Sequence, residues 1–216
     1  MDDAALDAAL YAAVIADLAR VNSITRARPP TINWLKKQTK SLQSFSVLDV
    51  GFGHGDMLRA IAAWARRDGR QVRLVGVDMN PRSAPVARAA TAAADGIEYV
   101  TGRAEAIEFQ TDFIISSLVA HHMADAELAD FIAWMQATAR HGWLINDLHR
   151  HPVAWLGFQA LAGILRWHPI VAHDGALSVR RALVREDWAK LLKTAGITAD
   201  VRWHIPFRWT VASCSR

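Results

Sequence analysis

The stretch VLDVGFGHGDMLRAIA (residues 47–62) joins a short apolar run to three glycines at alternate positions and then to a helical pattern. A strand, a glycine turn and a helix in this order are typical of an open α/β sheet, where ligands bind beyond the carboxyl ends of the strands. A dinucleotide fingerprint has its third glycine three positions after the second. Here the spacing is Asp49-x-Gly51-x-Gly53-x-Gly55, with an acid ahead of the glycines. That acid favours a cationic ligand over a pyrophosphate.

Length and composition are typical of one domain. The chain has 216 residues, of which 52% are hydrophobic, so it can bury a sizeable core. The opening residues carry acids where a signal peptide has positive charge, and the longest apolar run, 153–165, is shorter than the roughly 20 residues of a membrane-spanning helix. We therefore expect a cytoplasmic protein with no membrane span. The single cysteine, Cys214, allows neither an internal disulfide nor a thiolate metal cluster.

Apolar runs rich in Val and Ile alternate with helical patterns along most of the chain. The runs predict strands at residues 46–50, 72–78, 97–100, 112–118 and 142–147, and the patterns between them predict helices at 57–67, 83–94 and 126–140. This alternation predicts an α/β domain with a mainly parallel sheet. Near the end, a helix that stops at Gly196 precedes two alternating runs, 201–205 and 207–213, which predict an antiparallel hairpin.

Four segments of the chain resemble the motifs of Rossmann-like, class I S-adenosylmethionine (SAM)-dependent methyltransferases. Residues 49–55, DVGFGHG, resemble the first motif, and residues 75–80, VGVDMN, are similar to the second. Arg103-Ala104-Glu105 resembles the segment that meets the adenine, and residues 114–122 resemble the fourth motif. The resemblance implies a seven-stranded, mainly parallel sheet with a C-terminal antiparallel hairpin and helices on both faces. It also implies SAM as the cofactor.

The resemblance assigns cofactor contacts that agree with the chemistry of the residues. Glycines let the backbone pass close beneath the methionine part, and Asp49 can meet the ligand's amino group. Asp78 offers two acceptor oxygens to the ribose hydroxyls, and Met79 offers an apolar, polarisable contact to the adenine face. The expected cofactor-binding residues are Asp49, Gly51, Phe52, Gly53, Gly55, Asp78, Met79, Ala104, Glu105 and Ser117. A plain glycine turn would explain any one of these features, but not all of them together.

The segment after the fourth strand argues against several classes of methyl acceptor. Adenine and amide N-methyltransferases resemble one another in an Asp/Asn-Pro-Pro-aromatic motif, whereas residues 116–119 here are SSLV. Cytosine C5 enzymes need a cysteine nucleophile, and Cys214 lies at the wrong end of the chain. Metal-dependent catechol enzymes use carboxylates after the fourth and fifth strands. Asn146 and Asp147 could serve there, but residues 116–122 contain no carboxylate, so we predict no metal.

Histidines stand at the edge of the predicted sheet where the acceptor must lie. His121 and His122 follow the fourth strand, and His149 and His151 follow the fifth. A histidine there can take a phenol or enol proton, because its pKa suits neutral pH. We therefore predict His122, His149 and His121 as candidate catalytic residues. The alternative for each is a bond to a backbone group or to solvent. Arg150 is either a contact for an acidic substrate group or a surface arginine.

Two segments lie outside the predicted cofactor-binding core of this single domain. Residues 1–44 form an N-terminal cap, and residues 152–181 form an insertion that is apolar nearly all round. In the family that the motifs resemble, such additions cover the active site and select the acceptor. Trp155 and Trp167 are the best candidates for a substrate pocket. The alternative is a helix packed against the core or against the partner in a homodimer.

These observations predict an enzyme that transfers the SAM methyl to a hydroxyl, or to a carbon, of a small hydrophobic aromatic or polyketide-like acceptor. A weaker resemblance, in residues 145–183, to methyltransferases associated with bacterial type III polyketide synthases implies phenolic acceptors. One alternative is an RNA methyltransferase, because basic residues gather between Arg26 and Lys40. The net charge of +4 is a weak footprint, however, and no RNA-binding module is attached. Another alternative is a SAM-binding protein without catalysis.

Overall fold

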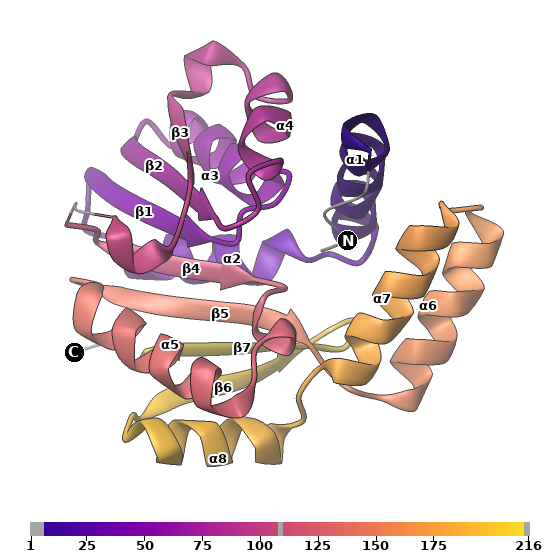
Figure 1. Cartoon of the computed structure of the whole chain (residues 1–216). Coiled ribbons are helices and arrows are strands. Elements are labelled where there is room, and N and C mark those ends of the chain that lie inside the picture. Colours follow the sequence, from indigo (N-terminus) through magenta and orange to yellow (C-terminus); the bar gives the residue numbers. More distant parts are fainter. Residues whose placement is uncertain (1–6, 108–109, 214–216) are drawn as a thin grey trace.

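A seven-stranded sheet forms the centre of the computed structural model, which describes residues 7–107 and 110–213 (Figure 1). The strand order is β3-β2-β1-β4-β5-β7-β6. The strands are β1 (Ser44–Val50), β2 (Gln71–Asp78), β3 (Ile97–Thr101), β4 (Phe113–Ser117), β5 (Gly142–Leu148), β6 (Ala199–His204) and β7 (Arg208–Ser213). Strands β1 to β5 run parallel, and β7 is antiparallel to both β5 and β6. The predicted sheet and closing hairpin are confirmed; Cys214 lies outside the described residues.

Helices pack on both faces of the sheet. They are α1 (Ala8–Ile24), α2 (Arg28–Gln38), α3 (Asp56–Arg67), α4 (Ser83–Ala89), α5 (Asp125–Thr138), α6 (Pro152–Ile164), α7 (Pro169–Arg181) and α8 (Arg185–Ala195). Three short 3₁₀ turns are η1 (Ala93–Asp95), η2 (Ala104–Ala106) and η3 (Ala120–His122). Side chains of α5 and α8 share one core cluster with the sheet, and side chains of α2 and α3 share the other.

Strand β1 is buried on both faces, as expected for a strand in the middle of a parallel sheet. Val47 belongs to the core cluster on the α2–α3 side, whereas its neighbour Leu48 belongs to the cluster on the α5–α8 side. The apolar side chains of α5 from Leu128 to Met135 are buried in the cluster on the α5–α8 side. These two cores hold the carboxyl end of β1, and hence the glycine loop after it, at a fixed position.

The predicted helix over residues 83–94 is shorter than expected. Helix α4 ends at Ala89, and after an extended residue, Ala92, the separate turn η1 follows. The hydroxyl of Thr91 donates to the Ala87 carbonyl at 2.7 Å and lies 3.0 Å from the Tyr99 hydroxyl. A threonine side chain that bonds the backbone in this way competes with the helical ladder. The predicted helix is therefore divided into α4 and η1 by a side-chain hydrogen bond that the pattern of apolar residues does not show.

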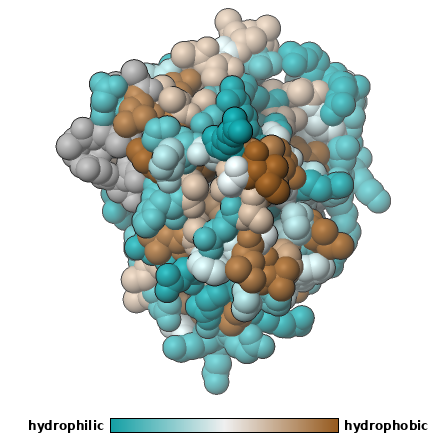
Figure 2. All heavy atoms as spheres, turned by 90° about the vertical axis from the view of Figure 1, so that its right-hand side faces the viewer, coloured by the Kyte–Doolittle hydropathy of each residue, from teal (hydrophilic) through white to brown (hydrophobic). Residues whose placement is uncertain are grey.

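The cap and the insertion lie beyond the carboxyl ends of the strands. In Figure 1 the arrowheads of β1, β4 and β5 point toward α1, α6 and α7. Helix α7 packs against α1 and against η3, and Val14, Val21 and Val171 form a small core between α1 and α7. Large apolar side chains at α6 remain exposed at Val153, Leu156, Ile164 and Leu165; Figure 2, which views this side, shows apolar patches among polar atoms. None of the described helices is long and apolar enough to cross a membrane.

Candidate active site

The loop after β1 requires its glycines. Gly51, Gly53 and Gly55 have φ angles of 75°, 52° and 74°, in the left-handed region that disfavours residues with a Cβ. A Cβ on Gly51 would lie 2.4 Å from the Val119 side chain, and a Cβ on Gly55 would lie 2.4 Å from the Tyr99 hydroxyl. The loop thus fits closely between the segment after β4 and the side chain of β3. A side chain at Gly51 or Gly55 would therefore displace the loop or these neighbours.

Asp49 is a buried carboxylate that lacks a full set of partners. Its residue is 2% exposed, and within the described ranges its Oδ1 has no hydrogen-bond partner. Burial raises the pKa of Asp49 well above its usual range, and the nearby carboxylates of Asp56 and Asp78 raise it further. A buried anion of this kind is unfavourable unless a cation or a donor pairs with it. The site is therefore suited to a positively charged group beside the glycine loop.

Asp78, at the end of β2, ties two loops together. Its Oδ2 accepts the Gly53 N–H at 2.9 Å and its Oδ1 accepts the Asn80 N–H at 2.9 Å. A carboxylate has about four lone-pair positions, so each oxygen can accept a further hydrogen bond from a vicinal diol. Met79, the next residue, is 68% exposed, which is uncommon for a large apolar side chain. Its side chain is therefore accessible to a flat aromatic ring.

The remaining residues predicted for the cofactor have different surroundings. Phe52 is buried against Tyr99, with ring centroids 4.8 Å apart, so its side chain belongs to the core. Ala104 is also buried in the core, whereas Glu105 is exposed and pairs with Arg103 at 3.3 Å. The buried Ser117 Oγ has no hydrogen-bond partner among the described residues. Their contacts with a cofactor stay predictions.

His121 and Asp147 form a buried dyad. The His121 backbone N–H donates to Asp147 Oδ2 at 3.0 Å, and its Nδ1 lies 2.7 Å from Asp147 Oδ1. Burial alone would raise the pKa of Asp147, but the His121 charge and hydrogen bonds, with backbone N–H groups of Leu148 and His121, outweigh it and lower the pKa. Within residues 7–107 and 110–213, no partner exists for the buried His121 Nε2. An ionised Asp147 accepts a hydrogen bond from Nδ1 and so orients the His121 ring, with Nε2 on the opposite side of the ring.

Asp147 was missed as a partner of histidine in the sequence. The sequence indicated Asp147 only as a candidate metal ligand. Linear spacing does not show that the turn after β4 folds back onto the end of β5. Strands β4 and β5 are direct neighbours, which brings the two residues together. A buried acid in a mostly apolar strand was the available signal. The described part of the chain contains no cluster of three or more His, Cys, Asp or Glu suited to a metal ion.

The other predicted histidines have separate surroundings. The ring of His122 lies 4.2 Å from that of His121 and is exposed. His149 accepts the Trp203 Nε1–H at 3.2 Å and packs edge-on against Trp209, and burial and then the charge of His151 lower its pKa. His151 accepts the Val153 N–H at 3.2 Å and so caps α6. The histidines after β5 therefore connect the hairpin and the insertion.

The residues predicted to bind the substrate lie in or beside the α6–α7 insertion. Trp155 is partly buried on α6, and Trp167 packs against Phe158 with ring centroids 5.5 Å apart. Arg150 is partly exposed and pairs with Asp187 at 2.9 Å, so its charge already has a partner. The substrate contacts of these three residues stay predictions.

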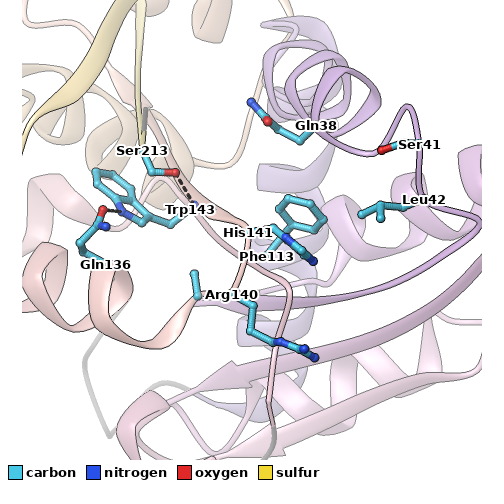
Figure 3. A pocket seen from close by; sticks show the side chains of 11 residues that line it. Gln38, Ser41, Leu42, Phe113, Gln136, Arg140, His141, Trp143 and Ser213 are labelled. Carbon is cyan, nitrogen blue, oxygen red and sulfur yellow. Dashed lines mark hydrogen bonds between the residues drawn. The ribbon is translucent and has the colours of Figure 1, made fainter. Parts of the chain in front are cut away.

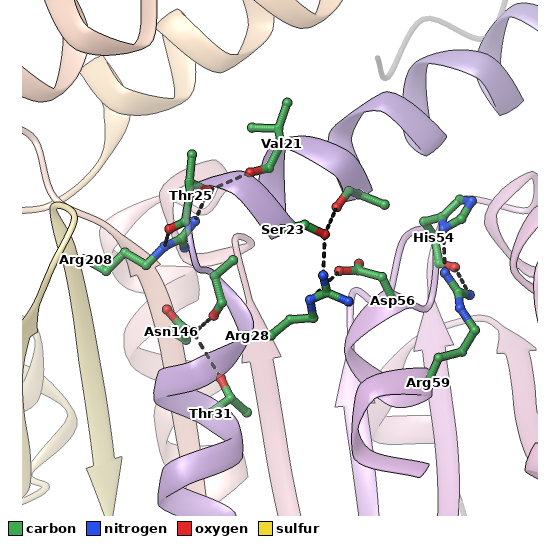
Figure 4. A network of polar contacts seen from close by, with 12 residues as sticks. Val21, Ser23, Thr25, Arg28, Thr31, His54, Asp56, Arg59, Asn146 and Arg208 are labelled. Atoms are coloured by element: carbon green, nitrogen blue, oxygen red, sulfur yellow. Dashed lines mark hydrogen bonds and ion pairs between the residues drawn. The ribbon is translucent and has the colours of Figure 1, made fainter. Parts of the chain in front are cut away.

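A polar network joins the corner between α1 and α2, which we define as residues 25–27, to the carboxyl edge of the sheet (Figure 4). Asn146 Nδ2 donates to the Ala27 carbonyl at 2.7 Å and to Thr31 Oγ1 at 3.0 Å. Arg208 Nη2 donates to Thr25 Oγ1 at 3.1 Å. Nothing in the sequence motifs marks Arg208, because its position at this edge depends on the antiparallel direction of β7.

Two open spaces lie away from the glycine loop. A cavity of about 250 Å³ lies at the amino ends of β4 and β5, beside Phe113, His141 and Trp143 (Figure 3). A wider groove of about 850 Å³ lies between α2 and the β6–β7 hairpin. Neither is lined by the residues predicted from the sequence. In open α/β sheets ligands bind at the carboxyl ends of the strands, so the glycine loop remains the candidate site.

Comparison with known proteins agrees with this geometry. Residues 47–142 match the family model described as a methyltransferase domain. Over this range the chain is similar to a methyltransferase domain. The matched range of this domain runs from β1 to the start of β5 and includes the glycine loop, Asp78 and His121. The prediction of a methyltransferase is thus confirmed, whereas none of the curated proteins matches the chain.

Solved structures of methyltransferases share the fold of the domain and its additions. A SAM-dependent methyltransferase from Aquifex aeolicus is 17% identical, with a TM-score of 0.66 over 96% of this chain and 97% of that one. The magnesium protoporphyrin IX methyltransferase of Synechocystis with bound S-adenosylhomocysteine (SAH) is 15% identical, with a TM-score of 0.60 over 90% and 83%. An O-methyltransferase family protein from Burkholderia thailandensis is 16% identical, with a TM-score of 0.66 over 98% and 61%. At these identities the likeness establishes the fold.

Proposed function

We propose that this protein transfers the methyl group of SAM to a hydroxyl group of a small hydrophobic aromatic acceptor. The observation that carries the proposal is Asp49, a buried carboxylate with an unpartnered oxygen beside a glycine loop in a methyltransferase domain. The ammonium group of SAM is the cation that would complete this site. The solved methyltransferases with bound SAM or SAH support the choice of cofactor. The alternative to methylation of the hydroxyl group is methylation of a carbon atom of the same acceptor.

The residues around the loop fit the rest of the cofactor. Asp78 would accept the two ribose hydroxyls, and the exposed Met79 would contact the adenine face. The backbone of Gly51 and Gly53 would pass beneath the methionine part, where a side chain would obstruct it. When bound, SAM supplies a methyl group on a positively charged sulfur that a nucleophile displaces in line.

The dyad provides a general base for the acceptor. Because Asp147 is ionised, His121 holds its proton on Nδ1 and presents Nε2 as a proton acceptor. Nε2 would accept the proton of the acceptor hydroxyl, so that its oxygen could attack the methyl group that bound SAM would supply, with SAH as the leaving group. Asp147 stabilises the imidazolium that forms, without taking the proton itself. His122, beside His121, and His149 remain alternative bases.

The acceptor class rests on the insertion and on the solved structures. Helix α6 has no charged residue, and its neighbour α7 packs on η3, which carries His121. Residues 152–181 would therefore act as an apolar lid over the acceptor, with Trp155 and Trp167 toward the pocket. The O-methyltransferase from Burkholderia thailandensis, which shares the fold, supports oxygen as the methylated atom. Alkylated resorcinols, pyrones and quinone-like phenols are the first acceptors to screen.

An RNA substrate is the second candidate function. The groove between α2 and the hairpin is lined by Arg26, Lys37, Arg202 and His204, a basic set suited to phosphates. Arg202, however, already pairs with Asp200. A third alternative is a protein that binds SAM without transferring its methyl group. The formation of a methylated product distinguishes both enzymes from such a protein.

Calorimetric titration with SAH, with NADH and NADPH as controls, tests the cofactor first. We expect micromolar binding of SAH alone. Labelled SAM is then used to compare methyl transfer to the phenol panel with transfer to total RNA. Label in a phenol supports the proposal, whereas label in RNA replaces it with the second candidate. Binding of a nicotinamide alone would overturn the assignment of the glycine loop.

A further inference from the structure

Arg208 lies at the carboxyl edge of the parallel strands although it is close to the end of the chain. It is the first residue of β7, and because β7 is antiparallel it begins where β5 ends, with Arg208 opposite Leu148. The backbone N–H of His149 donates to the carbonyl of Phe207, the residue before Arg208, at 2.9 Å. Arg208 therefore sits at the sheet edge that holds Asp147 and the acceptor.

Within the described ranges, the buried guanidinium of Arg208 forms no ion pair. The residue is 1% exposed, and its hydrogen bonds go to the carbonyl and the hydroxyl of Thr25, at 3.5 Å and 3.1 Å (Figure 4). Among the described residues, Nη1 has no hydrogen-bond partner. Burial lowers the pKa of Arg208 to about 10, although the charges of Asp147 and Asp56 oppose the shift, so the group is cationic at neutral pH.

Both nearby carboxylates are engaged elsewhere. Asp147 holds His121, and Asp56 lies 3.8 Å from Arg28 Nε. A buried charge without a counter-ion is strongly unfavourable, and arginine cannot escape by losing its proton near neutral pH. An anion at Nη1 would complete the site. Arg150, by contrast, is partly exposed and already paired with Asp187.

A second unpartnered polar atom lies under the same corner. Asn146 donates to Ala27 and Thr31, and its Oδ1 is buried without a partner in the described part of the chain. Asn146 precedes Leu148 by two residues on β5, so its side chain lies on the face of the sheet that also carries Arg208. An unused donor and an unused acceptor thus lie on the same face of two neighbouring strands, the arrangement that suits an acid group on a molecule that also carries a hydroxyl or amide N–H.

We propose that Arg208, with Asn146 beside it, binds a carboxylate carried by the methyl acceptor, so the acceptor is an acidic hydroxy-aromatic molecule. This inference rests on the proposed function. Strand β7 is three strands from β1 in the order β1-β4-β5-β7, roughly 14 Å at the usual strand spacing, which places Arg208 on the acceptor side of the glycine loop. Because Arg208 is buried, entry requires the corner at residues 25–27 to shift.

The test compares carboxylate probes with their neutral amides. Salicylate, 3-hydroxybenzoate and 4-hydroxybenzoate, and the three corresponding amides, are titrated calorimetrically into the free and the SAH-loaded protein. The wild type is compared with Arg208→Met, Arg208→Lys and Arg202→Met. Arg202 is an exposed arginine of the same hairpin, so its replacement is the matched control for the loss of one positive charge. SAH and 5′-methylthioadenosine, which lacks the amino-acid part, are titrated in parallel.

We expect the wild type and Arg202→Met to bind at least one carboxylate about tenfold or more tightly than its amide, the scale of a charged hydrogen bond. Arg208→Met should abolish this preference and leave SAH binding unchanged, whereas Arg208→Lys should retain part of it. Arg208→Lys also decides the question if the methionine variant does not fold. No carboxylate preference in the wild type, or an undiminished preference in the Arg208 variants, overturns the proposal.

Further outcomes distinguish an acceptor site at Arg208 from a cofactor contact and from a purely structural role. Weaker binding of SAH but not of 5′-methylthioadenosine to Arg208→Met would assign the guanidinium to the cofactor's own carboxylate and overturn the assignment to the acceptor. Failure of the wild type to bind SAH would contradict the proposed function, while the carboxylate titrations of the free protein would still decide whether Arg208 binds an acid. A lower melting temperature of Arg208→Met with undiminished carboxylate binding would show a purely structural arginine.

Discussion

Two buried carboxylates at the active-site edge have opposite pKa shifts because their partners differ. Asp147 is held by His121 and by backbone N–H groups, which lower its pKa, so it adds stability above about pH 3.8 that is lost as the pH falls through its folded pKa. Burial raises the pKa of Asp49, so its ionisation reduces stability as the pH rises from 3.8 through the raised value. The carboxylate of Asp147 already has its partners in the free protein, whereas that of Asp49 would gain a partner from the ligand under the proposed function.

Replacing Asp49 should therefore separate stability from binding. We expect Asp49→Asn to keep or raise the melting temperature at pH 7, because it removes a buried charge, while SAH binds about tenfold or more weakly. In the wild type SAH affinity should fall as the pH is lowered through the raised pKa, since protonated Asp49 cannot pair with the ammonium group. Calorimetry between pH 5 and 8 measures both. An equal pH dependence in the variant would contradict the role of Asp49.

Under the proposed function, Asp147 is a positioning residue that acts through His121. Asp147→Asn should lower kcat by roughly 10²-fold or more, within the range for loss of general-base catalysis, while SAH affinity changes little. His121→Gln should have a similar effect, and the double variant should not be much worse than either one, because the two residues act as a unit. The pH–rate profile supplies the decisive readout: loss of the fall in rate at low pH, where the base is protonated, supports the dyad, whereas an unchanged profile assigns Asp147 a structural role.

At the level of elements, the loop after β1 offers a matched pair of glycine substitutions. Gly51 and Gly69 both have left-handed φ angles, 75° and 66°, but a Cβ on Gly69 has no atom within 4 Å, whereas a Cβ on Gly51 meets Val119 at 2.4 Å. Gly69→Ala should cost about 1 kcal/mol from backbone strain alone. Gly51→Ala should add a displaced loop and bind SAH at least tenfold more weakly. Melting temperatures and titrations of both variants check this, and equal SAH affinities would show that the fit against Val119 is unimportant.

The packing between α6 and α7 tests the proposed lid. A Cβ on Gly175 in α7 would lie 2.1 Å from the ring of Phe158 in α6, whereas a Cβ on Gly157 in α6 meets nothing within 4 Å. Gly175→Ala should push the helices apart and raise the acceptor KM several-fold while SAH affinity is kept. Gly157→Ala should leave both constants unchanged and stabilise the helix slightly. Parallel changes in SAH affinity and acceptor KM would contradict a lid that contacts only the acceptor.

The sequence predicted those elements whose pattern is local. The alternation of strands and helices and the glycine spacing were sufficient for the fold and the methyltransferase domain. The helix predicted over residues 83–94 was wrong in length, because the Thr91 hydroxyl bonds the Ala87 carbonyl and lies within hydrogen-bond distance of Tyr99 on β3, and the apolar pattern shows neither contact. The pairing of His121 with Asp147 and the position of Arg208 depend on which strands are neighbours and on the direction of β7. Such relations exist only after folding, so no spacing in the chain reports them.

At the level of the whole molecule, the distribution of charge argues for a small acceptor. The formal net charge is only +4, and the groove between α2 and the hairpin includes an arginine already paired with an acid. We expect binding of single-stranded RNA to disappear near 0.15 M salt, because a few phosphate contacts cannot survive counterion competition. Fluorescence anisotropy with a labelled oligonucleotide, repeated at low salt, measures this. Binding that persists at 0.15 M would favour an RNA substrate.

The negative charges around the glycine loop also bear on the exchange of product for fresh cofactor. Asp49, Asp56 and Asp78 lie near enough to one another for two of them to raise the pKa of the third. Under the proposed function, the bound sulfur carries a positive charge before methyl transfer and none afterwards. The same three acids would therefore hold the reactant more strongly than the spent nucleoside, a difference that weakens as salt screens it. Product inhibition would then limit turnover less at low ionic strength than at high ionic strength.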